Sequence, residues 1–159
     1  MSSESKVLLI FGEGGHSQQM SRLCQHISVD KKDVISLVDK ENISSSISST
    51  EYVVPKLRSK YSVGFSTTLK NTIRNMTEFL RVFNDHNVKI VISTGPGICI
   101  IPSIFYKLKG REVIYIETWC RFSTKSLTGK VMYYVADKFY VQNRELLTLY
   151  PKAIYSGRL

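Results

Sequence analysis

Three glycines and a histidine follow an apolar run near the start of the chain. Residues 7–11 are apolar, and Gly12, Gly14, Gly15 and His16 come after them with one glutamate among the glycines. Glycine lets the backbone turn sharply and approach a ligand closely, and a helix beginning near His16 would point its free N–H groups at this turn. Such a turn predicts a phosphate or pyrophosphate site. His16 could donate to that phosphate or act as a base, although a lone histidine also suits a surface or capping role.

A second glycine turn follows another apolar run. Residues 89–93 lead into Gly95, Pro96 and Gly97. Pro96 stiffens this loop, while the glycines on either side keep its backbone open to a ligand. Taken alone, a tight structural turn explains the pattern nearly as well, but two such turns in one chain indicate a ligand site more strongly than either. Ser17, just after the first turn, is expected either to bind phosphate or simply to cap its helix.

A third segment, residues 117–130, is polar and basic where a plain connection could be short. Glu117 stands at the end of a predicted strand, where it could act as a general base or hold a sugar hydroxyl. Arg121, Lys125 and Lys130 could bind phosphate. An ion pair between Arg121 and Glu117 and ordinary surface lysines are the structural alternatives, and the residues alone leave them open.

The elements that must position these segments alternate along the chain. We predict strands at residues 7–11, 33–38, 52–54, 89–93, 112–117, 138–141 and 153–155, and helices at 16–28, 64–86, 98–108, 126–136 and 144–150. Alternation of this kind predicts an α/β fold with one doubly wound, mostly parallel Rossmann-like sheet, and the chain contains no linker or repeat that would divide residues 1–159 into domains. Ligands of such sheets bind beyond the carboxyl ends of the strands, so the three segments should converge there.

The long helix predicted at residues 64–86 carries an apolar stripe at helical spacing. Its members are Leu69, Ile73, Met76, Leu80 and Phe83. We expect this stripe to pack in the core, with membrane contact as the alternative.

Composition narrows the class of protein. The chain of 159 residues has a formal net charge of +9, which favours anionic partners such as phosphorylated substrates, an anionic membrane face or nucleic acid. No recognisable nucleic-acid module accompanies the charge, so we expect no nucleic-acid partner. Cys24, Cys99 and Cys120 form no CxxC pair, so a disulfide or zinc framework is not expected and a reducing cytosol fits. No metal site or cofactor is predicted, and no apolar run is long enough to span a bilayer.

Several segments resemble one known family: FGEGGHSQQM, STGPGICIIP, YIET, SLTGKVMYYVADKFYVQ and LYPKAIYSGRL. They are similar to the asparagine-linked glycosylation protein fourteen family and its bacterial PssD-like relatives, over nearly all of the chain. More distantly, the two glycine turns resemble those of the acceptor domain of the N-acetylglucosaminyltransferase MurG. The resemblance implies the N-terminal-like half of a split GT-B glycosyltransferase, non-catalytic alone. This half would bind a polyprenyl-pyrophosphate-linked sugar acceptor and recruit a separate donor-binding catalytic subunit to the membrane.

The resemblance also implies roles for individual residues. Gly14, Gly15 and His16 would face the acceptor pyrophosphate, residues 95–97 would form the second loop, and Glu117 and Arg121 would lie at the cleft, with His16 and Glu117 as the catalytic candidates. The partner interface would include four residues of the C-terminal block: Tyr155, Gly157, Arg158 and Leu159.

The resemblance leaves the biological setting to be inferred from the start of the chain. Eukaryotic members usually carry an N-terminal membrane helix, and none precedes residue 7 here. This favours a bacterial subunit of capsular or exopolysaccharide biosynthesis, located in the cytoplasm at the inner face of the plasma membrane. The basic loop at residues 56–60 and the long helix would then supply peripheral membrane attachment.

Two other functions fit part of the pattern. Gly12 and Gly14 after the first strand, with Asp39 at the end of the second, imitate the fingerprint of a nicotinamide dinucleotide enzyme, but Ser17 replaces the third glycine. The third hypothesis is a non-enzymatic membrane scaffold that keeps the fold without the site.

Overall fold

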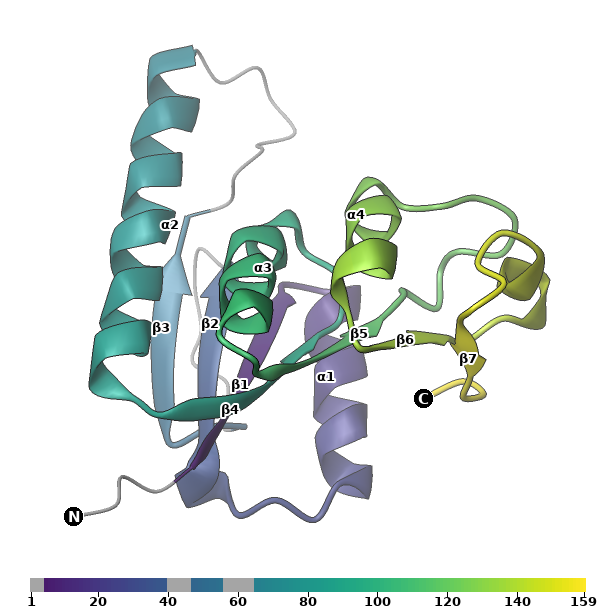
Figure 1. The fold of residues 1–159 in the computed structure, drawn as a ribbon, viewed down its shortest axis with the longest axis horizontal. Helices are drawn as coiled ribbons and strands as arrows, with labels where there is room; N and C mark the ends of the chain where they lie inside the picture. Colours follow the sequence, from purple (N-terminus) through teal and green to yellow (C-terminus); the bar gives the residue numbers. More distant parts are fainter. Residues whose placement is uncertain (1–4, 40–46, 56–64) are drawn as a thin grey trace.

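One parallel sheet organises the computed structural model, which describes residues 5–39, 47–55 and 65–159 (Figure 1). Its seven strands have the order β3-β2-β1-β4-β5-β6-β7, and all neighbouring strands are parallel. The strands are β1 (Lys6–Gly12), β2 (Val34–Asp39), β3 (Thr50–Val54), β4 (Val88–Ser93), β5 (Glu112–Ile116), β6 (Lys138–Val141) and β7 (Ile154–Tyr155). The helices are α1 (Gly15–His26), α2 (Phe65–Asp85), α3 (Ile100–Leu108) and α4 (Leu127–Val135), with 3₁₀ turns η1 (Lys31–Asp33), η2 (Gly97–Cys99) and η3 (Arg144–Thr148). The predicted fold class is confirmed.

Helices cover both faces of the sheet, which is why the central strands are continuous apolar runs. In β1, Leu8 and Ile10 belong to the core on the face covered by α2, α3 and α4, whereas Leu9 and Phe11 pack on the α1 side. This alternation follows from the two-residue period of a strand. Met20 of α1 completes the second core and is fully buried.

The apolar stripe of α2 is only partly in the core. Met76 and Phe83 pack against the buried cluster, but Leu69, Ile73 and Leu80 are 52%, 57% and 43% exposed. The expectation that the whole stripe packs in the core is therefore wrong for three of its five members.

The reason lies in how α2 is rotated and placed. Its buried side is centred on Phe79 and Val82, which are 3% and 0% exposed. The amino-terminal part of the helix also extends past the carboxyl ends of β2 and β3, where the sheet no longer covers it (Figure 1).

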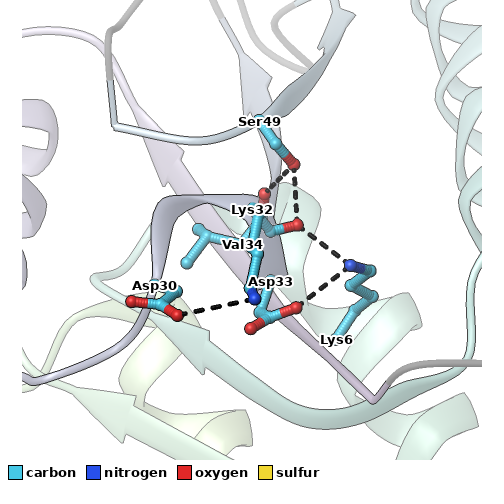
Figure 2. A network of polar contacts seen from close by, with 6 residues as sticks. All are labelled: Lys6, Asp30, Lys32, Asp33, Val34 and Ser49. Atoms are coloured by element: carbon cyan, nitrogen blue, oxygen red, sulfur yellow. Dashed lines mark hydrogen bonds and ion pairs between the residues drawn. The ribbon is translucent and has the colours of Figure 1, made fainter.

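A polar network joins the amino ends of β1 and β2, at the opposite edge of the sheet from the glycine turns (Figure 2). Lys6 Nζ donates to the Lys32 carbonyl oxygen at 2.9 Å and to Asp33 Oδ1 at 3.1 Å. Ser49 Oγ donates to the Val34 carbonyl oxygen at 2.8 Å, which adds the segment leading into β3. These contacts fix the start of three neighbouring strands.

Asp137 ties α3 to β5 near the same edge. Its carboxylate accepts from Lys107 Nζ and, at 2.9 Å, from the backbone N–H of Val113. Burial acts to raise the pKa of Asp137, but the hydrogen bonds from Lys107 and Val113 outweigh it, and the pKa is lowered. The ionised carboxylate is thus the form that the fold stabilises.

Two further expectations concern cysteines and membranes. Cys99 is buried, Cys24 is partly buried and Cys120 is exposed, and each is a free thiol. In the described ranges, none of the helices combines the length and the apolar character required to cross a bilayer. The basic loop predicted at residues 56–60 lies outside the described residues.

Candidate anion site at the two glycine turns

His16 joins the two glycine turns through two hydrogen bonds. His16 Nδ1 lies 2.6 Å from the Thr94 carbonyl oxygen, and Thr94 Oγ1 donates to the His16 carbonyl oxygen at 3.1 Å. Because a carbonyl oxygen can only accept, Nδ1 must carry the proton in this contact. In the neutral ring, Nε2 is then the nitrogen with a free lone pair, and it becomes a donor when the ring is protonated.

Close packing leaves no room for side chains where the turns meet. A Cβ at Gly95 would lie 2.8 Å from His16 Cε1, and the φ of Gly95 is +124°, a conformation that other residues rarely adopt. A Cβ at Gly12 would lie 2.3 Å from Asp39 Oδ1 and 3.5 Å from Pro96 Cβ. The sequence pattern therefore reflects real contact between the two loops.

The start of α1 supplies backbone donors that have no partner within the helix. Gly14 is the N-cap residue, with φ 67° and no side-chain cap, and the N–H of Gln18 makes the first helical hydrogen bond to the Gly14 carbonyl at 3.0 Å. The N–H groups of Gly15, His16 and Ser17 precede that bond and have no partner within the helix. Ser17 does not cap the helix, since it lies in the first turn, so the capping interpretation is wrong.

Trp119 brings the third segment against the first turn. Its Nε1 lies 3.9 Å from the position of a Cβ at Gly15, and the guanidinium of Arg22 lies 5.1 Å from the centre of its ring. Asn143 Nδ2 holds this segment by donating to the Trp119 carbonyl oxygen at 2.9 Å. The convergence of the three segments is thus present in the structure.

Glu117 is completely buried, and all its contacts are internal. Its carboxylate accepts from Ser126 Oγ at 2.9 Å, from the Tyr150 hydroxyl at 3.1 Å and from the Thr118 N–H at 3.0 Å. Burial and the Glu117 charge raise the pKa of Tyr150, so the phenol stays protonated and donates. Ser126 Oγ in turn accepts from the Gly129 N–H at 2.8 Å, which caps α4.

This placement makes Glu117 a support for α4 and for the segment beside the site. Its backbone carbonyl also accepts from Gln142 Nε2 at 3.0 Å and from Gln19 Nε2 at 3.5 Å. With both carboxylate oxygens engaged and no surface exposed, Glu117 is better suited to positioning than to proton transfer with a substrate.

Two of the three candidate cations of this segment, Arg121 and Lys125, make separate contacts, and Lys130 is exposed. Arg121 is exposed and donates to Thr124 Oγ1 at 3.0 Å. Lys125 Nζ lies 4.9 Å from the centre of the Tyr150 ring, a cation–π contact. The ion pair between Arg121 and Glu117, one of the two alternatives, is not formed among the residues that the structure describes.

The C-terminal block folds back onto its own chain. The Leu159 N–H donates to Gln142 Oε1 at 3.0 Å, and the Leu159 carbonyl accepts from Arg22 Nη1 at 2.9 Å. Tyr155 is 40% exposed and lies under the Arg144 guanidinium, 5.0 Å from its ring centre. Gly157 has φ +76°, and Arg158 is exposed. Tyr155 and Arg158 are thus accessible, while Leu159 is partly buried against the α1 core.

Several residues that build the site belong to no recognisable sequence motif. Gln19 and Gln142 donate to the Glu117 carbonyl oxygen. Asn143 donates to the Trp119 carbonyl oxygen, and Trp119 lies beside the first glycine turn. Tyr150 lies in the segment LYPKAIYSGRL, which carried the family resemblance, and that block was the available signal for it.

The fold and the paired glycine turns place the chain in the class of Rossmann-like proteins that resemble the N-terminal half of a GT-B glycosyltransferase. A solved structure of MurG from Acinetobacter baumannii is similar, with a TM-score of 0.58 and 14% sequence identity, over 87% of this chain and 41% of that chain. This likeness supports the fold. The model of the family described as "Oligosaccharide biosynthesis protein Alg14 like" matches residues 7–159. The chain therefore belongs to the Alg14-like family of oligosaccharide biosynthesis proteins.

Two relatives of this chain, from different organisms, share the same name. "UDP-N-acetylglucosamine transferase subunit ALG14" from Kluyveromyces lactis is 30% identical over 184 residues, covering 96% of this chain and 78% of the relative. The Homo sapiens protein of the same name is 24% identical, covering 96% of this chain and 82% of the relative. The predicted membership of the asparagine-linked glycosylation protein fourteen family is confirmed, whereas the likeness to bacterial PssD-like proteins stays a prediction.

Proposed function

We propose that this chain is the accessory subunit of a two-component glycosyltransferase that uses UDP-N-acetylglucosamine. The observation that carries the proposal is the family match over residues 7–159, together with relatives named as subunits of a UDP-N-acetylglucosamine transferase. In this proposal the chain binds a polyprenyl-pyrophosphate-linked sugar acceptor, and a separate donor-binding subunit supplies the nucleotide-sugar site.

The site offers what an acceptor pyrophosphate requires. The amides of Gly15, His16 and Ser17 open toward the turn, and the positive end of the α1 dipole favours an anion there. Gly97 and Gly14 are exposed, so the pyrophosphate can approach both loops closely. Arg121 and Lys125 belong to the segment whose Trp119 lies against the first turn, and in this proposal their charges attract the pyrophosphate.

His16 is the candidate for contact with the reacting end of the acceptor. Its Nδ1–H is engaged by the Thr94 carbonyl, which fixes the ring and leaves Nε2 available. Nε2 can accept a proton from an attacking sugar hydroxyl or, when protonated, donate to a phosphate oxygen. We assign Glu117 to positioning, because its carboxylate is buried under α4.

The division of labour is tested with the chain and its partner purified together. The pair should transfer N-acetylglucosamine from the UDP-sugar to a lipid-pyrophosphate-linked acceptor, and the chain alone should transfer little or none. Robust transfer by the isolated chain would overturn the proposal.

Variants of His16 separate chemistry from positioning. His16→Asn keeps a donor near the place of Nδ1 for the Thr94 carbonyl but removes Nε2, so we expect near-normal stability with a rate reduced roughly 10²-fold or more. His26→Ala, at the exposed last turn of the same helix, is the matched control and should keep full activity. A fully active His16→Asn pair would remove His16 from the reaction and favour a scaffold role.

The setting of the reaction also belongs to the proposal. A capsular or exopolysaccharide pathway would use the same site with a different sugar donor, so the transfer assay should compare UDP-N-acetylglucosamine with other UDP-sugars. The proposed arrangement has two further parts. The chain attaches peripherally to the membrane face, and the partner contacts Tyr155, Gly157, Arg158 and Leu159.

The family assignment disfavours the alternative of a nicotinamide dinucleotide enzyme. Calorimetric titration with NAD tests that alternative, because micromolar binding would support it.

A further inference from the structure

Trp119 presents a hydrogen-bond donor beside the first glycine turn. Its Nε1 is the atom of the third segment that comes nearest to Gly15, at 3.9 Å from the position of a Cβ there. Within the part of the chain that the structure describes, Nε1 has no acceptor and is not enclosed by protein atoms, so a ligand can reach it. An indole N–H can only donate, so the group that it meets must be an acceptor.

Contacts on two sides set the position of this indole. The Arg22 guanidinium lies 5.1 Å from the ring centre, and Arg22 Nη1 donates in turn to the Leu159 carbonyl oxygen at 2.9 Å. Asn143 Nδ2 donates to the Trp119 carbonyl oxygen at 2.9 Å, which fixes the backbone. The donor is therefore held in place before a ligand arrives, and little conformational entropy is lost when it binds.

The indole N–H and the amide at the start of α1 are close enough to share one anionic group. A Cβ lies about 2.5 Å from the nitrogen of its own residue, so Nε1 is at most about 6.5 Å from the Gly15 nitrogen. Two N–H donors that bond at about 2.9 Å can share one oxygen when they are up to about 6 Å apart, and two oxygens of one phosphate allow a longer span. The Gly15 amide has no partner within the helix, so a phosphate between these donors would be held by two separate segments of the chain.

We infer that Trp119 is a binding residue for the pyrophosphate of the acceptor, and that its indole N–H donates to a phosphate oxygen held at the start of α1. The inference rests on the proposed function, since it assumes a pyrophosphate-linked acceptor at the first glycine turn. The nucleotide sugar also contains a pyrophosphate, so the tests must compare the two substrates.

Trp119 is the one tryptophan of the chain, so intrinsic tryptophan fluorescence reports on this position alone. Titration of the full chain with inorganic pyrophosphate should change the emission saturably, with the same dissociation constant that calorimetry gives. Trp119→Phe keeps an aromatic ring for Arg22 but removes the N–H, so the pyrophosphate affinity measured by calorimetry should fall roughly tenfold or more. Tyr134→Phe also removes one donor from an aromatic side chain. Tyr134 is 85% exposed on α4, so this variant is the matched control and should keep the affinity.

Steady-state kinetics of the chain purified with its partner identify which pyrophosphate Trp119 contacts. A donor that binds the acceptor equally well before and during the reaction affects KM and not kcat. Trp119→Phe should therefore raise the KM for the lipid-pyrophosphate-linked acceptor roughly tenfold and leave kcat within about twofold. The KM for UDP-N-acetylglucosamine should stay unchanged. A raised KM for the nucleotide sugar in place of the acceptor would overturn the assignment to the acceptor.

The outcomes separate the role of Trp119 from the proposed function. Pyrophosphate binding without a change in emission, or wild-type affinity in Trp119→Phe, overturns the role of Trp119 and leaves the acceptor site standing. Absence of pyrophosphate binding to the wild-type chain in calorimetry overturns the proposed acceptor site, and the inference falls with it. The emission titration uses the wild-type chain, so this part of the test does not depend on how the variant folds.

Discussion

Gly129 is the position where one added methyl group tests how Glu117 holds α4. A Cβ there would lie 2.0 Å from Glu117 Oε2 and 2.7 Å from both Ser126 Oγ and the Tyr150 hydroxyl. In Gly129→Ala the carboxylate must move and lose at least one hydrogen bond, which costs about 1.5–3 kcal/mol. Overpacking adds about 1–3 kcal/mol, and the better helix propensity of alanine offsets about 1 kcal/mol. We therefore expect a loss of about 1.5–5 kcal/mol in the free energy of unfolding.

Urea unfolding followed by circular dichroism measures this loss. Gly15→Ala is the control, since its Cβ would meet only Trp119 Nε1 at an ordinary 3.9 Å. That variant should stay within about 0.5 kcal/mol of the wild-type chain.

A double-mutant cycle shows whether the strain comes from the carboxylate. In a Glu117→Ala background the nearest obstacle is gone, while Ser126 Oγ and the Tyr150 hydroxyl remain at 2.7 Å, so the cost of Gly129→Ala should fall by about the 1.5–3 kcal/mol of the lost carboxylate hydrogen bond. A cost below about 0.5 kcal/mol in the wild-type background, or the same cost in both backgrounds, would refute the reasoning.

Two further predictions concern titratable groups. Iodoacetamide at pH 8 should label exposed Cys120 and leave Cys99 unmodified until the chain unfolds, because burial raises the pKa of the Cys99 thiol to about 12; mass spectrometry that finds Cys99 labelled early would contradict this. The lowered pKa of Asp137 means that its carboxylate stabilises the fold above its unfolded pKa of about 3.9, and that this contribution disappears as the pH falls through the folded value. Asp137→Asn should therefore be less stable than the wild-type chain at pH 7, and the difference in urea unfolding should shrink below about pH 4. A difference of constant size across this range would show that the charge is not responsible.

The strands and the glycine turns could be predicted because their signals are local. Buried parallel strands are continuous apolar runs, and glycines mark the places where backbones must approach closely. Gly12 and Gly95 are such places, since each faces a side chain from another segment. The convergence of the loops then follows from the rule that parallel strands share a carboxyl edge.

The rotation of α2 could not be predicted from its apolar spacing. Two overlapping stripes satisfy the helical period, and the one that contains Leu69 and Ile73 is the more apolar. The structure instead turns Thr72 and Asn75 inward to line a pocket. The apolar spacing therefore favoured a face of α2 that is largely exposed in the structure, rather than the face that contains Phe79 and Val82.

The burial of Glu117 depends on contacts far away in the sequence. Tyr150, 33 residues later, donates to its carboxylate, and Ser126 connects it to the first turn of α4. A glutamate after a strand has the same local pattern whether it faces a cleft or supports a neighbouring helix. Only the return of the C-terminal segment distinguishes the two.

The strand order places β1 beside β4 at the centre of the sheet, and the chain winds outward in opposite directions from this pair. The helix after β1 lies on one face and the helix after β4 on the other, so the two loops approach the carboxyl edge from opposite faces and meet where His16 packs against Gly95. A bound molecule can therefore contact one loop that follows β1 and one loop that follows β4. These two loops belong to different halves of the sheet. Substitutions in the outer strands can therefore change the surface that other proteins contact without altering these two loops.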